Sequence, residues 1–308
     1  MKGLELAEAF FQSYGMPMIN SKFGGYKNRM AAGLVGDGSE CYGFDDDISR
    51  DHDWGPSFCL WLNKTDFLII GRALQAEYES LPQSFGGYGP RKTSDWGEGR
   101  VGVIEIGAFY QNFIGLDRVP NSLDEWLYIP ESALAACTNG KIFYDPLGEF
   151  TRFRTGLKAF YPEDVRLKKI ASRCMTIAQS GQYNFIRCVK RREYVAAQYA
   201  ETKFCADVIS LTFLMNKKYT PFYKWMHRAA RELPLLGEFI YNRLLEIVMC
   251  HDYEKKSQFI EEVCAALIDE LRRQGLTEST SDFLLDHGPV IQQKIRDPQL
   301  RARNVWVG

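Results

Sequence analysis

The stretch that decides the fold is Gly33–Leu62, which reads GLVGDGSECYGFDDDISRDHDWGPSFCLWL. Apolar runs at 31–36 and 58–62 enclose a turn that is rich in glycine and acidic residues. Short runs of apolar and aromatic residues between turn residues are typical of strands, and continuous apolar runs indicate strands that are covered on both faces. The stretch therefore predicts part of a small sheet, with the acidic loop leading into a further extended segment at 51–54.

Helical and extended patterns alternate on both sides of this stretch. Apolar side chains recur at helical spacing over 3–14, with Gly15 in the position of a C-terminal cap, and again over 65–80. The run 101–110 has the composition of another strand. Residues 82–100 are rich in glycine and include two prolines, so we expect a long loop that is either a lid or a plain surface insertion.

Beyond Pro162 the pattern is almost wholly helical, with apolar stripes over 237–250 and 258–273. The predicted fold class is α+β, with a small mixed β-sheet domain followed by an all-α helical bundle. We place the α/β domain at 1–155 and the helical domain at 156–308.

The composition is that of a globular protein in water. The chain has 308 residues, of which 45% are hydrophobic, and a mean hydropathy of −0.28. It contains no apolar run of the roughly 18 residues that a membrane span needs. Glu5 and Glu8 interrupt the region where a secretory signal would be apolar, so we expect a cytoplasmic protein. The spacing of the eight cysteines and four histidines argues against a disulfide framework or a zinc centre.

Charge is segregated along the chain although the net charge is −1. Residues 1–151 hold 12 basic and 21 acidic residues (net −9), 152–224 hold 15 and 5 (net +10), and 225–308 hold 11 and 13 (net −2). An acidic part followed by a basic part is suited to holding a polyanion with divalent cations. The alternative is that the basic segment is a solvated helical face.

A pair of acids in the deciding stretch points to metal chemistry. In an extended segment, residues two apart project from the same face, so Asp51 and Asp53 are expected to point together and His52 away from them. Two carboxylates on one face repel unless a cation neutralises them, and Mg²⁺ favours such oxygen ligands together with phosphates. Asp45, Asp46 and Asp47 are further acids that could take the ligand role.

Two other features fit the same chemistry. The turn at Gly38-Ser39 offers backbone N–H groups and a hydroxyl to phosphate oxygens. Glu105 lies in an otherwise apolar run, Val103–Gly107, where an unpaired charge is costly. We expect Glu105 to be a third metal ligand or a base that takes a proton from an attacking hydroxyl; pairing with an Arg or Lys is the other explanation.

Gly38-Ser39, a spacer of eleven residues, and then Asp51-His52-Asp53 resembles the signature of the polymerase-β-type nucleotidyltransferase superfamily, with Glu105 in the setting of its third acidic position. The α/β domain followed by a helical domain resembles bacterial antibiotic nucleotidyltransferases of the aminoglycoside type. The segment 140–145 is similar to the strand that often closes their catalytic domain. The stretch from Gly33 to Asp53 also looks like an uncharacterised bacterial domain family of this superfamily.

The resemblance implies transfer of a nucleoside monophosphate, as AMP from ATP or from another nucleoside triphosphate, to an acceptor hydroxyl with release of pyrophosphate. One or two Mg²⁺ ions are implied at Asp51, Asp53 and Glu105, and Gly38-Ser39 would hold the β- and γ-phosphates. The implied acceptor is a small hydroxylated molecule, with a tRNA end or a protein side chain as the alternative. A nucleotide-binding or sensing protein without turnover is the competing hypothesis from another class.

The segment 216–225 breaks one helix and starts another, with Pro221 suited to the first helical position. Helix starts attract anions, and ammonium groups serve phosphates well. Here we expect Lys218 or Lys224 to reach the triphosphate and Tyr223 to stack on a ring of the nucleotide or substrate. Interdomain packing by the aromatics, with solvated lysines, is the alternative. The same segment would suit RNA, although a sequence pI of about 6.5 lacks the excess positive charge of a dedicated nucleic-acid binder.

Overall fold

The computed structural model describes residues 1–95 and 97–308. The chain forms two compact units, which we describe one at a time. The first unit consists of residues 1–119 and 133–159, and the second consists of residues 120–132 and 160–308. No helix in these described ranges is long and apolar enough to cross a membrane.

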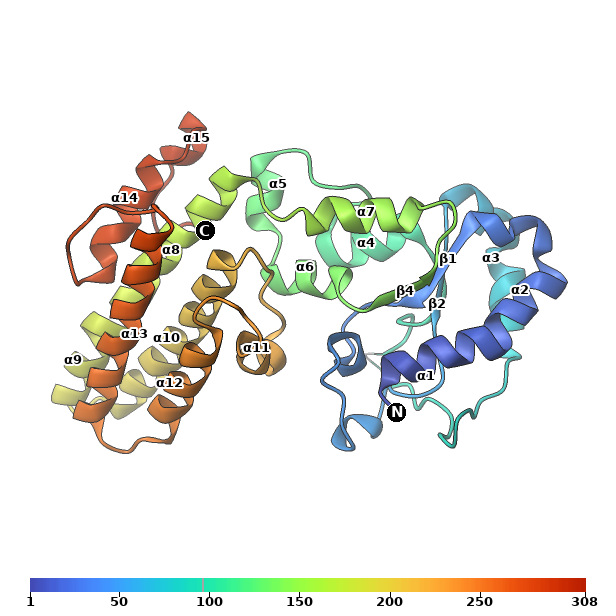
Figure 1. Ribbon diagram of the computed structural model, residues 1–308, viewed down its shortest axis with the longest axis horizontal. Helices are drawn as coiled ribbons and strands as arrows, with labels where there is room; N and C mark the ends of the chain where they lie inside the picture. Colours follow the sequence, from blue (N-terminus) through green and yellow to red (C-terminus); the bar gives the residue numbers. More distant parts are fainter. Residues whose placement is uncertain (96) are drawn as a thin grey trace. The chain divides into compact units, whose positions relative to one another are not determined.

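A mixed sheet forms the centre of the first unit. In the part of this unit that the structure describes, four strands pair in the order β3-β2-β1-β4 (Figure 1). They are β1 (Met30–Leu34), β2 (Cys59–Leu62), β3 (Gly102–Glu105) and β4 (Lys141–Tyr144). Strand β1 is antiparallel to both β2 and β4, whereas β2 and β3 are parallel. The predicted small mixed sheet is confirmed.

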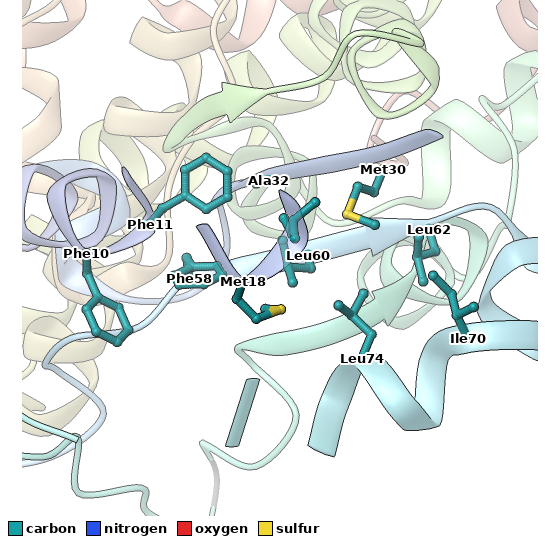
Figure 2. Packing of buried hydrophobic residues seen from close by; sticks show 11 residues of the cluster. Phe10, Phe11, Met18, Met30, Ala32, Phe58, Leu60, Leu62, Ile70 and Leu74 are labelled. Atoms are coloured by element: carbon teal, nitrogen blue, oxygen red, sulfur yellow. The ribbon is translucent and has the colours of Figure 1, made fainter. Parts of the chain in front are cut away.

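Helices cover one face of the sheet with a large apolar cluster. They are α1 (Gly3–Phe10), α2 (Met16–Lys22) and α3 (Lys64–Glu79). Figure 2 shows side chains from these helices meeting Leu60 and Leu62 of β2. These two residues lie two apart, and successive side chains of a strand point to opposite faces, so both reach the same cluster.

Helices α4 (Ile106–Ile114) and α7 (Glu149–Lys158) cover the other face. Trp61 of β2 points there, and its ring stacks on Phe150 of α7 with ring centroids 3.9 Å apart. It also meets Phe109 of α4 edge-on at 5.5 Å. The prediction that the apolar strands are covered on both faces is therefore correct.

Three local predictions about this unit are wrong. Gly15 does not end the first helix: it lies in a π-helical turn, Phe11–Gly15, that leads directly into α2. The run 101–110 is extended only as far as Glu105 and continues as helix α4. Residues 51–54 form bends instead of a strand, and β2 begins at Cys59.

The second unit is helical, which confirms the predicted character of the C-terminal part. Helix α8 packs on α10 and α14, and α12 packs on α13 (Figure 1). The helices are α5 (Leu123–Tyr128), α8 (Glu163–Ile177), α9 (Ile186–Lys190), α10 (Tyr194–Met215), α11 (Tyr223–Ala230), α12 (Gly237–Met249), α13 (Tyr253–Arg273), α14 (His287–Gln293) and α15 (Pro298–Arg301). Helix α6 (Glu131–Thr138) begins within the residues of this unit and continues within those of the first.

Part of the basic segment is buried inside the second unit. Arg166 of α8 donates from Nε to the Leu214 carbonyl at 3.0 Å, and Lys168 donates from Nζ to Gln292 Oε1 at 2.7 Å. Both side chains are almost fully buried. These charges join distant segments of the bundle, so they are neither a solvated helical face nor available to a polyanion.

Candidate functional site

The turn that follows β1 is held in place by one asparagine. Gly36 donates its N–H to Asn139 Oδ1 at 3.0 Å, and Asn139 Nδ2 donates back to the Gly36 carbonyl at 2.7 Å. Gly36 has φ +146°, a conformation that L side chains rarely adopt. Arg154 in turn donates to the Asn139 carbonyl at 2.7 Å. The turn is therefore fixed by residues more than 100 positions away in the sequence.

The next residues present backbone N–H groups. Gly38 precedes a short 3₁₀ helix, Ser39–Tyr42. The N–H groups of Asp37, Gly38 and Ser39 donate to no other residue within 1–95 and 97–308. Consecutive free N–H groups in a turn form an anion-binding concavity. That Gly38 and Ser39 hold phosphate oxygens stays a prediction from the sequence.

Glycine at position 38 is required by a carboxylate. A Cβ on Gly38 would lie 2.4 Å from both side-chain oxygens of Glu40. Glu40 is buried, and its Oε1 lies 3.6 Å from Nη1 of Arg91. Burial raises the pKa of Glu40, and the Arg91 charge opposes this shift.

The described residues of 82–100, which are 82–95 and 97–100, form a loop that returns to this turn. Arg91 donates from Nη1 to Ser57 Oγ at 3.1 Å, and its Nε is buried without a hydrogen-bond partner in the described part of the chain. Arg100 Nη1 lies 3.6 Å from Asp53 Oδ2. The loop is thus held by specific contacts to 53–57, and it contributes two guanidinium groups to the neighbourhood of Gly38.

Asp53 anchors the loop. Its N–H donates to the Lys92 carbonyl at 2.7 Å, and Ser94 donates its backbone N–H to Oδ1 at 2.9 Å and its hydroxyl to Oδ2. Burial alone would raise the pKa of Asp53, but the Ser94 hydrogen bonds and the positive charge of Arg100 outweigh it, so that the pKa is lowered. Asp53 also has φ +52°, a left-handed conformation that Asp tolerates better than most residues.

Asp51 is exposed and makes local contacts. Its Oδ1 accepts the N–H of His52 at 2.9 Å and lies 2.9 Å from His52 Nδ1. The side chain of Asp51 is 64% exposed, whereas that of Asp53 is 8% exposed. The predicted arrangement, with both acids on one face of a strand and His52 turned away, is wrong because residues 51–54 do not form a strand.

Glu105 caps a helix. Its carboxylate accepts the N–H groups of Gly107 at 2.8 Å and Ala108 at 2.7 Å, at the start of α4. Such N-terminal caps satisfy the free N–H groups of a first helical turn. This explains a charge in an apolar run, and pairing with an Arg or Lys is not needed to explain it. In the parallel pair β2/β3, Glu105 lies opposite Leu62 at the end of β2, whereas Asp53 precedes the start of β2.

The predicted metal ligands are therefore not brought together. Among residues 1–95 and 97–308, no group of three or more His, Cys, Asp or Glu side chains could hold a metal ion. The carboxylates of Asp53 and Glu105 already accept hydrogen bonds from the protein. The side chain of Asp51 is exposed and contacts His52. In this arrangement Asp51, Asp53 and Glu105 do not fit a shared Mg²⁺ ion.

The three neighbouring acids have local structural partners. Asp45 accepts the Gly3 N–H at 2.8 Å and the Trp54 indole N–H at 3.1 Å. Asp46 accepts the N–H groups of two residues in the following turn, and Asp47 pairs with the nearby Arg50 at 2.7 Å. Each of these acids therefore stabilises a turn, a helix start or a local ion pair.

A pocket of about 320 Å³ opens beside the glycine turn. Its described lining comes from the first unit: the end of β1 and the turn after it, residues 91 and 98–101, β3 and α4. It includes Gly36, Asp37, Gly38, Arg91, Arg100 and Asn112. The side chain of Asp37 is exposed at the surface, yet partial desolvation of its carboxyl group raises its pKa. The positive charge of Arg100 opposes this shift. Phosphate-binding groups of two kinds, backbone N–H and guanidinium, thus face one pocket.

The three residues predicted to bind nucleotide from the basic segment lie in the second unit. Lys218 follows α10, and Tyr223 and Lys224 begin α11; all three side chains are exposed. The predicted break between two helices is confirmed, but α11 begins at Tyr223, so Pro221 lies before the helix and not at its first position. Lys224 Nζ lies over the ring of Trp225.

The sequence analysis did not identify Arg91, Ser94, Arg100 or Asn139. Three of them lie within 82–100, which the composition predicts to be a lid or a plain surface insertion without marking any single residue. Two arginines within a glycine-rich loop beside a predicted phosphate turn are a signal that could have selected Arg91 and Arg100. Asn139 has no such signal, because its role depends on the pairing of β4 with β1.

A family model described as a domain of unknown function (DUF4037) matches residues 126–226, which lie after the Gly38–Asp53 motif. No curated protein matches the chain. Among solved structures, the chain is similar to a nucleotidyltransferase-like protein from Exiguobacterium sibiricum 255-15. That likeness has 10% sequence identity, covers 87% of this chain and 76% of the other, and has a TM-score of 0.37, too low to support an argument about the site.

The resemblance to enzymes that modify aminoglycosides stays a prediction.

Proposed function

We propose that the first unit binds a nucleoside triphosphate in the pocket beside Gly38 and that the protein transfers its nucleoside monophosphate to a hydroxyl acceptor. The observation that carries this proposal is that Asp37 and Gly38, whose N–H groups are free within the described residues, line one pocket together with Arg91 and Arg100. Backbone N–H groups and guanidinium groups are the donors that proteins use for phosphate oxygens.

Arg91 and Arg100 are suited to different parts of the polyphosphate. Arg91 is buried and has an unpartnered Nε, so it offers a donor whose desolvation is already complete. Arg100 is about one third exposed and lies 3.6 Å from Asp53, so it can turn part of its guanidinium toward a ligand. Because Asp37 and Glu40 also line the pocket, we expect the substrate to enter as its magnesium complex, whose cation offsets their charge.

In the proposed reaction the acceptor oxygen forms a bond to the α-phosphorus and the bond from that phosphorus to the pyrophosphate oxygen breaks. Pyrophosphate leaves, and the hydroxyl proton passes to solvent. ATP, which would transfer AMP, is our first choice of nucleotide. The protein contributes binding and positioning through the turn and the two arginines.

A metal bound by Asp51, Asp53 and Glu105, whether one ion or two, remains a prediction from the resemblance. For these three to share Mg²⁺, Asp53 and Glu105 would have to exchange their present donors for the ion. We therefore assign no step of the reaction to a resident metal.

Nucleotide binding by the pocket is tested by Arg100→Gln. We expect the affinity for ATP to fall about tenfold to a hundredfold, because a hydrogen bond to a charged group contributes about 1.5–3 kcal/mol. Arg72→Gln is the matched control, since Arg72 is an exposed arginine on α3 of the same unit. Titration of each variant with ATP and Mg²⁺ measures the difference. If the unmutated protein and both variants bound ATP with equal affinity, this pocket would not be the nucleotide site.

Transfer itself is tested with α-labelled nucleoside triphosphates, Mg²⁺ or Mn²⁺, and a cell extract. We expect label to appear in an acceptor and pyrophosphate to be released. If Asp51 is the metal ligand that the resemblance implies, Asp51→Asn should abolish transfer. The stability should change little, because Asp51 is exposed and contacts only its neighbour His52 within the described residues. Full activity in this variant would contradict the role predicted for Asp51.

The acceptor is proposed to be a small hydroxylated molecule. The burial of Arg166 and Lys168 leaves fewer of the basic residues available to RNA than the sequence suggests. Added salt distinguishes the alternatives, because counterion release makes RNA affinity fall steeply with salt. A steep loss of acceptor affinity with salt would favour a tRNA end; a small effect would favour a small molecule or a protein side chain.

One observation favours a second candidate, a nucleotide-binding or sensing protein without turnover. The carboxylates predicted to be catalytic are engaged by protein donors or lie apart. The labelling experiment separates the two candidates: saturable nucleotide binding without pyrophosphate release, in every extract tested, would identify the binding protein.

A further inference from the structure

The helical unit contains a second and larger pocket, of about 640 Å³. All of its described lining belongs to this unit. The lining comes from residues 127–132, from α8 and α10, from 220–226, and from 307–308. Pockets that bind small molecules have volumes of about 300–1,000 Å³, so this one has room for a compact organic ligand.

A buried lysine without a partner lines this pocket. Lys169 of α8 is only 4% exposed, and its Nζ makes no hydrogen bond or ion pair with any residue in 1–95 or 97–308. The described contact of its ammonium is with the face of the Tyr161 ring, 5.2 Å from the centroid. Its Nζ is not fully enclosed by the protein and opens to the pocket, where an oxygen atom from outside the chain can accept a hydrogen bond from it.

The other charged groups of the wall are already compensated by the protein. Arg173 donates to Ser210 Oγ at 2.9 Å, to the Gly308 carbonyl at 2.9 Å, and to Glu131 Oε1 at 3.2 Å. Glu131 also accepts the hydroxyl of Thr220 at 2.6 Å. With Glu131 committed to these donors, it does not reach Lys169 within ion-pair distance.

A second acid of the wall, Asp207, lies near two cations, but its buried Oδ2 accepts no hydrogen bond from the described residues. Its Oδ2 lies 3.1 Å from Lys203 Nζ, and its Oδ1 lies 3.9 Å from Arg173 Nε. Of the four charged side chains that line the pocket, Lys169 is the one that makes no hydrogen bond or ion pair within the described residues. Burial lowers the pKa of this lysine to about 8, with Glu131 opposing the shift and Arg173 adding to it.

Aromatic side chains stand on the solvent side of the pocket. Tyr128, Phe222 and Tyr223 line it and are exposed, and the rings of Phe222 and Tyr223 lie 4.3 Å apart. Leu127, Ile129 and Met226 add apolar surface. A ligand in this pocket would meet a buried cation at one end and exposed aromatic surface at the other.

We infer that this pocket binds a small organic oxyanion, a carboxylate or a phosphate attached to an apolar or aromatic body, whose oxygens accept from Lys169 Nζ. The site is separate from the proposed nucleotide pocket and does not depend on the proposed transfer reaction. Tyr223 lines this pocket, so it would contact the ligand within the helical unit.

The inference is tested on the full chain with two probes, benzoate and phenyl phosphate, by calorimetric titration. We expect at least one probe to bind saturably, and the ratio of the two affinities shows whether a carboxylate or a phosphate is preferred. Lys169→Met should weaken binding at least about tenfold, the loss of a charge-assisted hydrogen bond. Lys190→Met is the control, because Lys190 is an exposed lysine at the end of α9 and does not line the pocket.

A second measurement keeps the test independent of whether the variant folds. Amine acylation of the unmutated protein, followed by mass spectrometry, reports the reactivity of Lys169, and the bound probe should reduce it several-fold while leaving Lys190 unchanged. Three results would overturn the inference: no saturable binding of either probe in the millimolar range, equal affinity in Lys169→Met, or binding without protection of Lys169.

Discussion

Asp53 shows how a single side chain orders a long loop. Its carboxylate accepts both the N–H and the hydroxyl of Ser94 and faces Arg100, while its own N–H binds the Lys92 carbonyl. A Cβ on Gly97 would lie 1.8 Å from Asp53 Oδ1, so the loop passes directly over the carboxylate. The loop 82–100 is thus tied to the residue that the motif singles out.

Replacing this carboxylate by an amide, in Asp53→Asn, should lower the free energy of unfolding by about 1–3 kcal/mol, since buried donors lose an ionic acceptor. The pKa of Asp53 is below its ordinary value of 3.8 in the folded protein, so its contribution is complete at neutral pH and is lost as the pH falls through that lowered pKa. Urea unfolding at neutral and acidic pH measures both effects. Asp51→Asn is the control. If it lowered the free energy of unfolding as much as Asp53→Asn does, the structural role assigned to Asp53 would be wrong.

Helix boundaries in the first unit are decided by contacts outside the helices. Gly15 has helical dihedral angles, and a Cβ there would lie 2.6 Å from Cζ of Phe58 and 2.7 Å from Cδ2 of Phe11. Glycine at this position therefore allows close approach to the sheet and does not terminate the helix. In the same way the apolar run 101–110 changes from strand to helix at Ile106 because Glu105 caps the helix that follows.

The packing at Gly15 leads to a prediction with an unusual sign. Glycine to alanine normally stabilises a helix by up to about 1 kcal/mol. Gly15→Ala should instead destabilise the protein by about 1–3 kcal/mol, because the added methyl group displaces the Phe58 ring. Gly24→Ala is the control, since a Cβ there meets nothing within 4 Å. Chemical denaturation of both variants decides the matter, and a stabilised Gly15→Ala would show that the ring moves freely.

For the whole molecule, the charge segregation has an internal consequence. Lys168 and Lys169 are both buried in the second unit, and burial lowers the pKa of each to about 8. Lysines in the unfolded chain keep the ordinary value of 10.5, so the folded protein binds these protons less tightly than the unfolded chain does. Stability should therefore rise as the pH increases from about 8 to 10.5.

The size of this effect is on the order of 3 kcal/mol for Lys169. Urea unfolding of the full chain across this pH range measures it, and Lys169→Met should remove that part of the rise. If the wild-type protein and the variant had the same pH dependence, Lys169 would not be a desolvated ammonium in the folded state.

The elements were largely predictable because the information for them is local. The sheet at 30–34 and 59–62, the helix 64–79 and the helical C-terminal part all follow from the residues within a few positions of each. The candidate site was predictable in part: Gly38 and Ser39 form the expected turn, whereas Asp51, Asp53 and Glu105 do not gather in the described residues. The positions of Asp53 and Glu105 depend on hydrogen bonds to Ser94 and to the start of α4. The spacing of residues in the sequence does not predict these contacts.

By itself, the sequence determined the α+β class, the turn at Gly38-Ser39 and the positive segment, since composition and periodicity act over short distances. Only the tertiary structure decided that Arg91 and Arg100 face that turn and that Lys169 is left without a partner in a pocket. The physical reason is that burial and pairing depend on atoms supplied by residues distant in the chain. Asp53 and Ser94 are 41 positions apart, and Gly36 and Asn139 are 103 apart.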